Sequence, residues 1–299
     1  MSMIVKDILN MGTVRLAGAG CMEAKLDAEL LLCHLLGIDK SRLFMSWGKD
    51  LNDDWCEAFF DLLERRCTGM PLQHITGWQE FMGLRFSVSE KVLIPRQETE
   101  VLVDTALMLL RERKAKTVLD LCTGSGAIAV SLDRLGAADH KVGKLEITAS
   151  DISREALAVA RSNAKALGAD KIKFVCGDLF VPFDKKFRAP KFDLIISNPP
   201  YIERSVIPTL QREVRDHEPL LALDGGEDGL DLYRRIITQA PRFLRSAGIL
   251  LLEIGAGQAA AVRGLAAACG QYDEADIFQD LAGRDRIAIL CLKEAGGKR

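Results

Sequence analysis

The residues best suited to chemistry are four in a row, and they directly follow an apolar run over residues 192–197 that predicts a buried strand: Asn198-Pro199-Pro200-Tyr201. Open α/β sheets bind their ligands at such strand ends. The side-chain carbonyl of Asn198 can accept an N–H, while the prolines fix φ and leave carbonyls that no following amide recaptures. The ring of Tyr201 adds a flat face for stacking.

Together these groups suit a planar, neutral –NH₂ whose lone pair is tied up in conjugation, as in an amide or the exocyclic amine of adenine or cytosine. Two acceptors on its hydrogens favour a more tetrahedral nitrogen, which can attack an electrophilic methyl group without a strong base. No His or Cys stands beside the motif to act as one. The structural alternative is a proline-rich turn, because Pro-Pro after a buried strand also makes a good stop.

A glycine loop lies upstream, where a strand predicted over residues 118–121 runs into Cys122-Thr123-Gly124-Ser125-Gly126 and then into a predicted helix. Glycines in such a loop let the backbone approach a ligand and leave N–H groups at the helix start free to bind acceptors or anions. The loop resembles a dinucleotide fingerprint with Ala129 in place of the third glycine, which that pattern tolerates. A Gly-x-Gly loop also occurs by chance, so it indicates a ligand-binding site only together with the strands around it.

Acidic residues end the next two predicted strands. The strand over residues 145–150 leads to Asp151, 25 residues after the glycine loop, near the spacing at which an acid binds ribose hydroxyls. The following strand leads to Asp178, which can accept from an adenine amine while Leu179 or Phe180 covers the ring. Each acid alone could be an N-cap or a solvated charge. Four strand ends with suitable chemistry, in the correct order, predict a nucleoside-containing cofactor.

Further motifs continue this pattern along the chain: residues 71–77, 80–84, 92–100, 225–230, 253–255 and 280–286, together with Glu218-Pro219 and Tyr233-Arg234. With them, residues 118–292 resemble a class I S-adenosylmethionine-dependent methyltransferase, and the wider chain resembles the peptide-chain release factor glutamine methyltransferases, the HemK/PrmC family. The Asn-Pro-Pro-Tyr motif is shared with adenine methyltransferases, whereas the motifs within residues 71–100 are more specific.

The resemblance implies methyl transfer from S-adenosylmethionine, with S-adenosylhomocysteine as product, to the side-chain amide nitrogen of a glutamine. That glutamine belongs to the Gly-Gly-Gln loop of peptide-chain release factors, which are the expected partners. The expected cofactor-binding residues are Cys122, Thr123, Gly124, Ser125, Gly126, Asp151, Asp178, Leu179 and Asn198. The expected catalytic residues are Asn198, Pro199, Pro200 and Tyr201.

The same resemblance implies an α/β fold, with a Rossmann-like, seven-stranded, mostly parallel sheet in a methyltransferase domain over residues 98–299. Apolar residues recur at helical spacing near the N-terminus, so residues 1–71 are expected to form a small helical bundle. We expect this bundle to recognise the substrate, and a purely stabilising cap is the alternative. Alternating residues and turn glycines predict a β-hairpin linker over residues 72–97.

Three positions depart from the family pattern. Gln97 stands where the family usually has proline, and Cys122 where the loop usually has its first glycine. Leu179 replaces an aromatic residue of some relatives, so that aliphatic packing on adenine would replace stacking. Neither Gln97 nor Cys122 removes a group that the chemistry needs.

Composition narrows the class of protein. The 299 residues carry 40 Lys or Arg against 42 Asp or Glu, a formal net charge of −2, so we expect no stable nucleic-acid binding. No apolar run approaches the roughly 20 residues that span a bilayer, and no signal peptide is evident, so a cytoplasmic protein away from membranes is expected. The eight cysteines and four histidines share no metal-ligand spacing, so no metal site is expected.

Two rival functions stay open. An adenine-amine methyltransferase acting on DNA or RNA would use the same Asn-Pro-Pro-Tyr chemistry, but would need a basic groove or a base-flipping pocket. A nucleoside-binding interaction module would bind the cofactor without turnover. A nicotinamide oxidoreductase is weaker still, because hydride transfer gives the Asn-Pro-Pro-Tyr segment no task.

Overall fold

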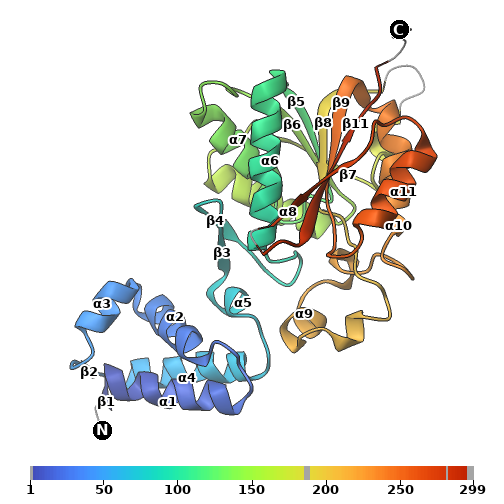
Figure 1. Cartoon of the computed structure of the whole chain (residues 1–299). Helices are drawn as coiled ribbons and strands as arrows, with labels where there is room; N and C mark the ends of the chain where they lie inside the picture. Colours follow the sequence, from blue (N-terminus) through green and yellow to red (C-terminus); the bar gives the residue numbers. More distant parts are fainter. Residues whose placement is uncertain (1–2, 185–188, 281, 295–299) are drawn as a thin grey trace. The chain divides into compact units, whose positions relative to one another are not determined.

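Two units, each with its own apolar core, make up the protein in this computed structural model, which describes residues 3–184, 189–280 and 282–294 (Figure 1). The first unit contains Met1–Trp78 and Leu210–His217. The second contains Gln79–Thr209 and Glu218–Arg299. Each unit is described by itself.

The first unit is built from helices whose apolar faces meet in a buried core, as the spacing of its apolar residues predicts. Ile8 and Phe59 are completely buried in this core. Asp39 and Asn52 cap two of the helices by accepting backbone N–H groups. The elements are β1 (Met3–Ile4), α1 (Val5–Gly18), α2 (Ala24–Leu36), α3 (Lys40–Met45), β2 (Asp50–Leu51), α4 (Asp53–Cys67), α5 (Leu72–Thr76) and α9 (Arg212–His217), with β1 antiparallel to β2.

A buried arginine ties α9 into this unit. Arg66 of α4 is 4% exposed and pairs with Asp27 of α2 at 2.8 Å and with Glu213 of α9. A buried guanidinium needs such carboxylate partners, because an unpaired charge is costly away from water. Residues 210–217 therefore belong to the helical unit, although they follow the Asn198–Tyr201 segment in the sequence.

The second unit begins within a hairpin, whose first residue, Trp78, is counted with the first unit, and continues as alternating strands and helices. Its elements are β3 (Trp78–Phe81), β4 (Leu84–Ser87), α6 (Gln97–Arg113), β5 (Thr117–Leu121), α7 (Ala127–Ala138), β6 (Glu146–Asp151), α8 (Arg154–Ala166), β7 (Lys173–Cys176), β8 (Phe192–Ser197), α10 (Asp231–Gln239), β9 (Leu244–Glu253), α11 (Ala259–Cys269), β10 (Asp276–Gln279) and β11 (Asp285–Cys291). Short 3₁₀ helices are η1 (Val181–Phe183), η2 (Ile207–Thr209), η3 (Leu220–Ala222) and η4 (Ala240–Arg242).

A seven-stranded sheet in the order β10-β11-β9-β8-β5-β6-β7 forms the centre of this unit. Strand β11 runs antiparallel to both its neighbours, and the pairings from β9 to β7 are parallel. The chain starts at β5, moves to β6 and β7 on one side, and returns to β8 on the other. This reversal creates a topological switch point between β5 and β8, where Leu121 pairs with Ser197. The expected mostly parallel sheet is confirmed.

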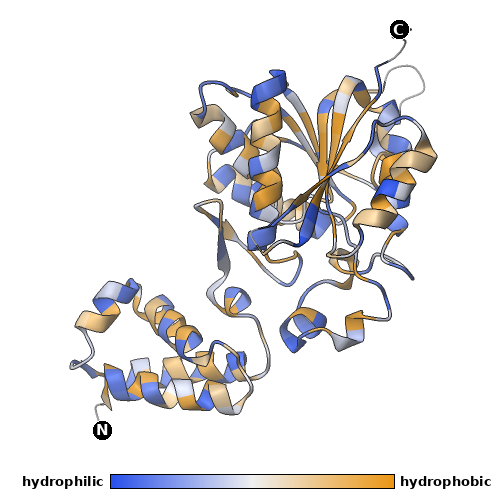
Figure 2. Ribbon diagram, in the orientation of Figure 1, coloured by the Kyte–Doolittle hydropathy of each residue, from blue (hydrophilic) through white to orange (hydrophobic). Residues whose placement is uncertain are grey.

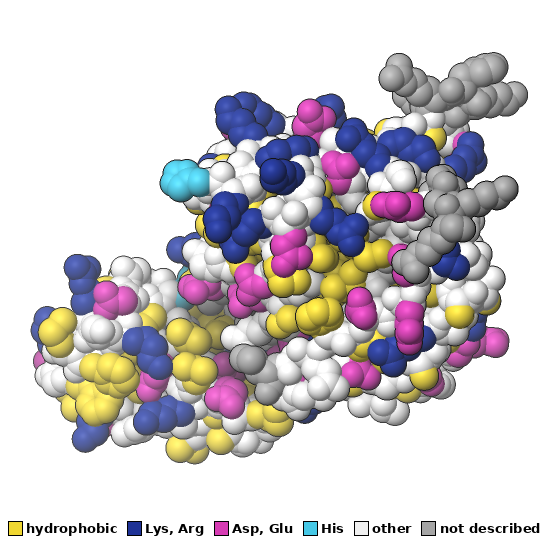
Figure 3. Space-filling view, turned by 45° about the horizontal axis from the view of Figure 1, so that its top comes forward, with side chains coloured by type: hydrophobic (Ala, Val, Ile, Leu, Met, Phe, Trp, Pro, Cys, Tyr) yellow, Lys and Arg dark blue, Asp and Glu magenta, His cyan; other side chains and the backbone are white. Residues whose placement is uncertain are grey.

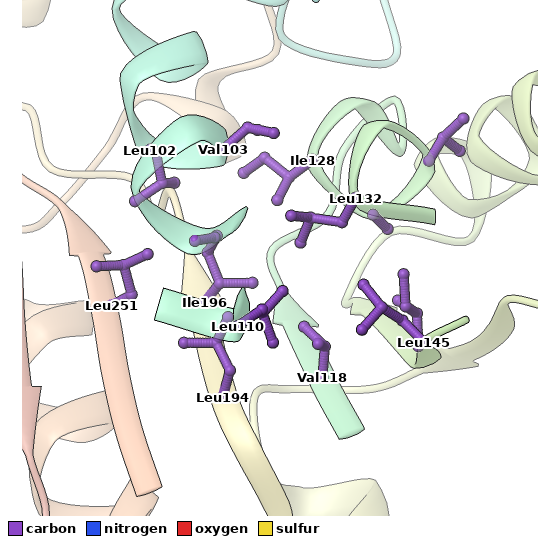
Figure 4. Packing of buried hydrophobic residues seen from close by; sticks show 14 of the residues in the cluster. Leu102, Val103, Leu110, Val118, Ile128, Leu132, Leu145, Leu194, Ile196 and Leu251 are labelled. Carbon is purple, nitrogen blue, oxygen red and sulfur yellow. The ribbon is translucent and has the colours of Figure 1, made fainter. Parts of the chain in front are cut away.

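Helices cover both faces of the sheet, with α6, α7 and α8 on one face and α10 and α11 on the other (Figure 1). Figure 2 shows hydrophobic strands between helices whose colours alternate, as expected for elements that bury one side. On the first face, Leu102 of α6, Ile128 of α7 and Ile196 of β8 belong to one buried cluster (Figure 4). This close packing holds the strands, and therefore the residues at their ends, in fixed positions.

The hairpin is shorter than the segment expected over residues 72–97. Its strands cover Trp78–Phe81 and Leu84–Ser87, and residues 72–76 form helix α5. The helix begins after Pro71 and stops at Gly77, whose φ of +81° is the left-handed conformation of a helix C-terminus. Residues 97–113, from the last position of the expected linker onward, form α6.

Candidate active site

A cavity of about 260 Å³ lies at the carboxyl ends of β5, β6, β7 and β8. The residues predicted from the sequence that line it are Cys122, Gly124, Asp151, Asp178, Leu179, Asn198 and Pro200. The predicted residues that are not among its lining are Thr123, Ser125, Gly126, Pro199 and Tyr201. The structure therefore brings all the strand ends singled out in the sequence to one cavity.

The glycine loop turns tightly after β5. Gly124 has a φ of +54°, and a Cβ placed on it would meet no atom within 4 Å, so its backbone is open to a ligand. Cys122 also has a positive φ, +59°, which a residue with a Cβ rarely adopts. Burial raises the pKa of its thiol to about 12, so the sulfur stays protonated at neutral pH.

Thr123 and Gly126 stabilise the turn through contacts outside the cavity lining. The Thr123 hydroxyl donates to the buried Asp120 carboxylate at 2.5 Å, and the Thr123 N–H donates to the Ser150 carbonyl at 3.0 Å. A Cβ on Gly126 would lie 3.1 Å from the Cβ of Ala160, so this glycine allows α8 to approach the loop. The role of Gly126 visible here is helix packing.

The carboxylate of Asp151 is held at the end of β6 by backbone groups. It accepts the N–H of Gly124 at 2.9 Å and the N–H of Ser153 at 2.9 Å, one on each oxygen. Burial raises the pKa of Asp151, and these two hydrogen bonds oppose that rise. Each oxygen keeps a lone pair, so the side chain can still accept hydroxyl groups from the cavity.

Asp178 is ion-paired beyond β7. Arg235 of α10 donates to its Oδ2 atom at 2.6 Å, and both residues line the cavity. Leu179, with a φ of +45°, supplies an apolar wall there. Phe180, which the sequence offered as an alternative cover, stacks on Phe243 in the core with ring centroids 4.7 Å apart.

The side chain of Asn198 is anchored at one end. Its Nδ2 donates to the Thr99 hydroxyl at 3.1 Å, and no hydrogen bond to its Oδ1 is found among the described residues. Because Asn198 lines the cavity, this oxygen is available as an acceptor for a ligand. The role of Asn198 as an acceptor for the substrate amide stays a prediction.

Tyr201 occupies a mostly buried position next to the cavity. Its hydroxyl donates to Glu253 at 3.4 Å, and its backbone carbonyl accepts from the Gln258 side chain at 3.0 Å. A Cβ on Gly225 would lie only 2.7 Å from the Tyr201 Cα, so that glycine permits a close approach. Stacking of the Tyr201 ring on a substrate stays a prediction.

Two further segments of the cavity wall were not assigned from the sequence. They consist of Lys91, Val92 and Leu93, and of Pro219, Leu221 and Ala222. Glu218, next to Pro219, links the two segments, because its carboxylate accepts hydrogen bonds from the Ile94 N–H at 3.2 Å and the Arg96 guanidinium at 2.6 Å. Val92, Leu93 and Pro219 belong to the family motifs, which was the signal that could have identified these segments.

Gln97 shows why one departure from the family pattern is tolerated. It is the first residue of α6, a position whose N–H has no partner within the helix. Proline is favoured there, but its loss removes no hydrogen bond.

Within the described ranges, no cluster of His, Cys, Asp and Glu has an arrangement suited to a metal ion. Among these residues, no helix is both long enough and apolar enough to cross a membrane.

The strand order, the glycine loop and the carboxylates at the strand ends define a Rossmann-like methyltransferase domain. Residues 112–272 match a methyltransferase domain model, and residues 7–77 match the PrmC N-terminal domain. The catalytic domain of hMettl16 shares the fold, with a TM-score of 0.53 and 16% identity over 77% of this chain and 81% of that one.

Curated relatives identify the family. The release factor glutamine methyltransferase of Moorella thermoacetica is 41% identical over 98% of this chain and 100% of the relative. That of Cereibacter sphaeroides is 42% identical over 97% of this chain and 99% of the relative. The chain belongs to the release factor glutamine methyltransferase family.

Proposed function

We propose that this enzyme transfers a methyl group from S-adenosylmethionine to the side-chain amide nitrogen of the glutamine in the Gly-Gly-Gln motif of peptide-chain release factors. Its curated relatives are named for this activity. The observation that carries the proposal is the Asn198 side chain, which is tied by its nitrogen to Thr99 and keeps its oxygen for the cavity.

The cavity suits the cofactor that class I methyltransferases use. Bound S-adenosylmethionine supplies an electrophilic methyl group. Asp151 offers acceptors for ribose hydroxyls, and Asp178 keeps one carboxylate oxygen beyond its pair with Arg235. Leu179 offers an apolar surface for adenine, and the open backbone at Gly124 leaves room for the methionine end.

The chain's own groups act by orientation. The Asn198 Oδ1 and the Pro199 carbonyl would accept the two hydrogens of the substrate amide, and Pro200 and Tyr201 would pack against its plane. Holding two reactants in near-attack geometry contributes roughly 7–11 kcal/mol, so no strong base is required. The methylated amide cation is strongly acidic, and its proton leaves after transfer.

The helical unit offers a surface for a protein substrate. Figure 3 shows hydrophobic side chains exposed on this unit, at the left of the view. Phe44 and Trp47 are 43% and 37% exposed, with ring centroids 5.1 Å apart, and Met45 between them is 75% exposed. Aromatic residues and methionine are enriched at protein interfaces. We assign substrate recognition to this unit, a cytoplasmic location to the enzyme, and no stable nucleic-acid complex.

The test uses methyl-labelled S-adenosylmethionine with a purified release factor, its Gln→Ala loop variant and unmethylated nucleic acid in parallel. Label on the intact factor alone is the expected result. Label on nucleic acid would move the assignment to an adenine-amine methyltransferase, and no label anywhere would favour a binding module.

Asn198→Ala separates chemistry from cofactor binding. The variant should lower turnover far more than it weakens affinity for S-adenosylhomocysteine, measured by calorimetry. Equal losses in both would contradict the role given to Asn198.

A further inference from the structure

A buried carboxyl lies next to the anchored end of Asn198. Glu253 ends β9 with 1% exposure, and within the described part of the chain its Oε2 accepts no hydrogen bond at standard distance. Its Oε1 accepts the Tyr201 hydroxyl at 3.4 Å. The Thr99 hydroxyl lies near enough to the same carboxyl to lower its pKa, although no hydrogen bond between the two at standard distance is found among the described residues. The function proposed above assigns no role to this buried carboxyl.

Thr99 connects the carboxyl to Asn198. It lies in the first turn of α6 with 5% exposure, and its oxygen accepts the Asn198 Nδ2 at 3.1 Å. On the same helix, the buried Thr105 donates its proton to the Val101 carbonyl at 2.8 Å. Among the described residues no such backbone bond is found for the Thr99 hydroxyl. Its proton is therefore available to Glu253.

The carboxylate gives this chain of hydrogen bonds its direction. A threonine hydroxyl both donates and accepts, so Thr99 alone would tolerate either orientation of the Asn198 amide. An ionised Glu253 can only accept, so the Thr99 hydroxyl would donate its hydrogen bond to this carboxylate. Thr99 can then only accept from Asn198, which turns Nδ2 toward α6 and Oδ1 toward the cavity. The reversed amide would present –NH₂ there, which cannot accept a substrate N–H.

We propose that Thr99 and Glu253 are positioning residues that fix the Asn198 amide with its oxygen toward the substrate. This inference rests on the proposed function, because it gives Asn198 the acceptor role assigned there. It adds two residues from different elements, one at the start of α6 and one at the end of β9, to the machinery of methyl transfer.

Two charged groups and one hydroxyl act on Glu253 besides Thr99. Arg286 of β11 lowers its pKa, and Glu98 of α6 raises it. Arg286 is itself paired with Asp280 at 3.0 Å. The Tyr201 hydroxyl also lowers the pKa of Glu253 by hydrogen bonding. Burial outweighs these groups and raises the pKa of Glu253 to about 7.

A pH dependence follows. Above about pH 7 the carboxylate accepts from Thr99 and the direction is fixed. Below that pH the protonated carboxyl can donate to Thr99 instead, and the Asn198 amide is free to reverse. Turnover should therefore fall as the pH drops through about 7, while the substrate amide itself does not titrate in this range.

The experiment compares four variants in methyl transfer to a release factor. Thr99→Val removes the hydroxyl at nearly constant shape, Thr99→Ser retains it, and Glu253→Gln removes the titrating group. Thr105→Val is the matched control, because it removes another buried hydroxyl from the same helix. Thermal unfolding confirms that each variant is folded, and calorimetry gives its affinity for S-adenosylhomocysteine.

Thr99→Val should lower kcat about 10- to 100-fold, with unchanged affinity for S-adenosylhomocysteine. Thr99→Ser should keep a kcat near that of the wild type. In Glu253→Gln, turnover should no longer decrease as the pH drops below 7. Equal kcat values for Thr99→Val and Thr105→Val would overturn this inference but leave the proposed function standing. An unchanged pH profile in Glu253→Gln would do the same. No transfer by the wild-type enzyme would overturn the proposed function and the inference with it.

Discussion

At the residue scale, a few polar side chains define the cavity, and hydrogen bonds to neighbouring protein groups hold them in place. Asp151 is fixed by two backbone N–H groups and Asn198 by one side-chain hydroxyl. Such supported groups need little reorganisation when a ligand arrives, which is the main way in which proteins orient reactants.

Cys122 tests how much strain the glycine loop carries. In the folded state, a Cβ at a φ of +59° costs roughly 1–2 kcal/mol. Glycine avoids this cost but loses more backbone entropy on folding, so part of the gain is lost. We expect Cys122→Gly to be more stable than Cys122→Ala by about 1 kcal/mol, measured by urea unfolding. Alanine is the control, because it removes the thiol and keeps the Cβ. Equal stabilities would show that the Cβ is not strained.

Asp151→Ala tests the ribose assignment. Loss of a charged acceptor should weaken S-adenosylhomocysteine binding by at least about tenfold, since hydrogen bonds to charged groups contribute about 1.5–3 kcal/mol. Once the cofactor is saturating, KM for the release factor should stay the same. Asp170→Ala, at an exposed position in the loop after α8, is the control. Unchanged calorimetric affinity in Asp151→Ala would remove this residue from the cofactor site.

At the element scale, one buried amide joins three parts of the second unit. Asn163 of α8 is 1% exposed, donates to the carbonyls of Ser87 and Ser125 at 3.0 and 2.9 Å, and accepts the Ser87 N–H at 2.8 Å. It therefore links the end of β4 to the glycine loop. Every polar atom of this side chain is used, which is what makes a buried amide tolerable.

Asn163→Ala should lower the free energy of unfolding by roughly 2–4 kcal/mol, because it leaves buried backbone groups without partners. Affinity for S-adenosylhomocysteine should fall as well, since the glycine loop loses its support. Asn163→Asp should be at least as damaging, because it keeps the acceptor for Ser87 but places a carboxylate against two carbonyls. Denaturant titration measures both variants, and wild-type stability of the aspartate variant would refute this explanation.

At the scale of the whole molecule, the chain forms two compact units, a helical unit and a methyltransferase unit. Residues 210–217 leave the second unit after the Asn198 segment and belong to the first, where Arg66 pairs with Glu213. The chain then returns to supply Glu218 and the wall segment that begins at Pro219. One continuous stretch therefore contributes to both units.

The aromatic pair of the helical unit tests how the protein substrate is recognised. The double change Phe44→Ser and Trp47→Ser should raise KM for a full-length release factor about tenfold or more, as loss of an interface anchor does. A short Gly-Gly-Gln peptide should be methylated as before, because it lacks the rest of the release factor that this surface would bind. Met108→Ser, at an exposed position of α6, is the control. A matching loss with the peptide would indicate a general defect instead.

The sequence by itself determined the chemistry at the strand ends, because short motifs place backbone and side-chain groups through local geometry alone. It thereby predicted the glycine loop and the positions of Asp151, Asp178 and Asn198 at strand ends, and the family resemblance implied the sheet. Only the tertiary structure decided which atom of Asn198 faces the cavity, since Thr99 lies 99 residues away. Likewise, the links made by Glu218 and Asn163 span 124 and 76 residues. Partners so far apart are chosen by packing, which no local pattern records.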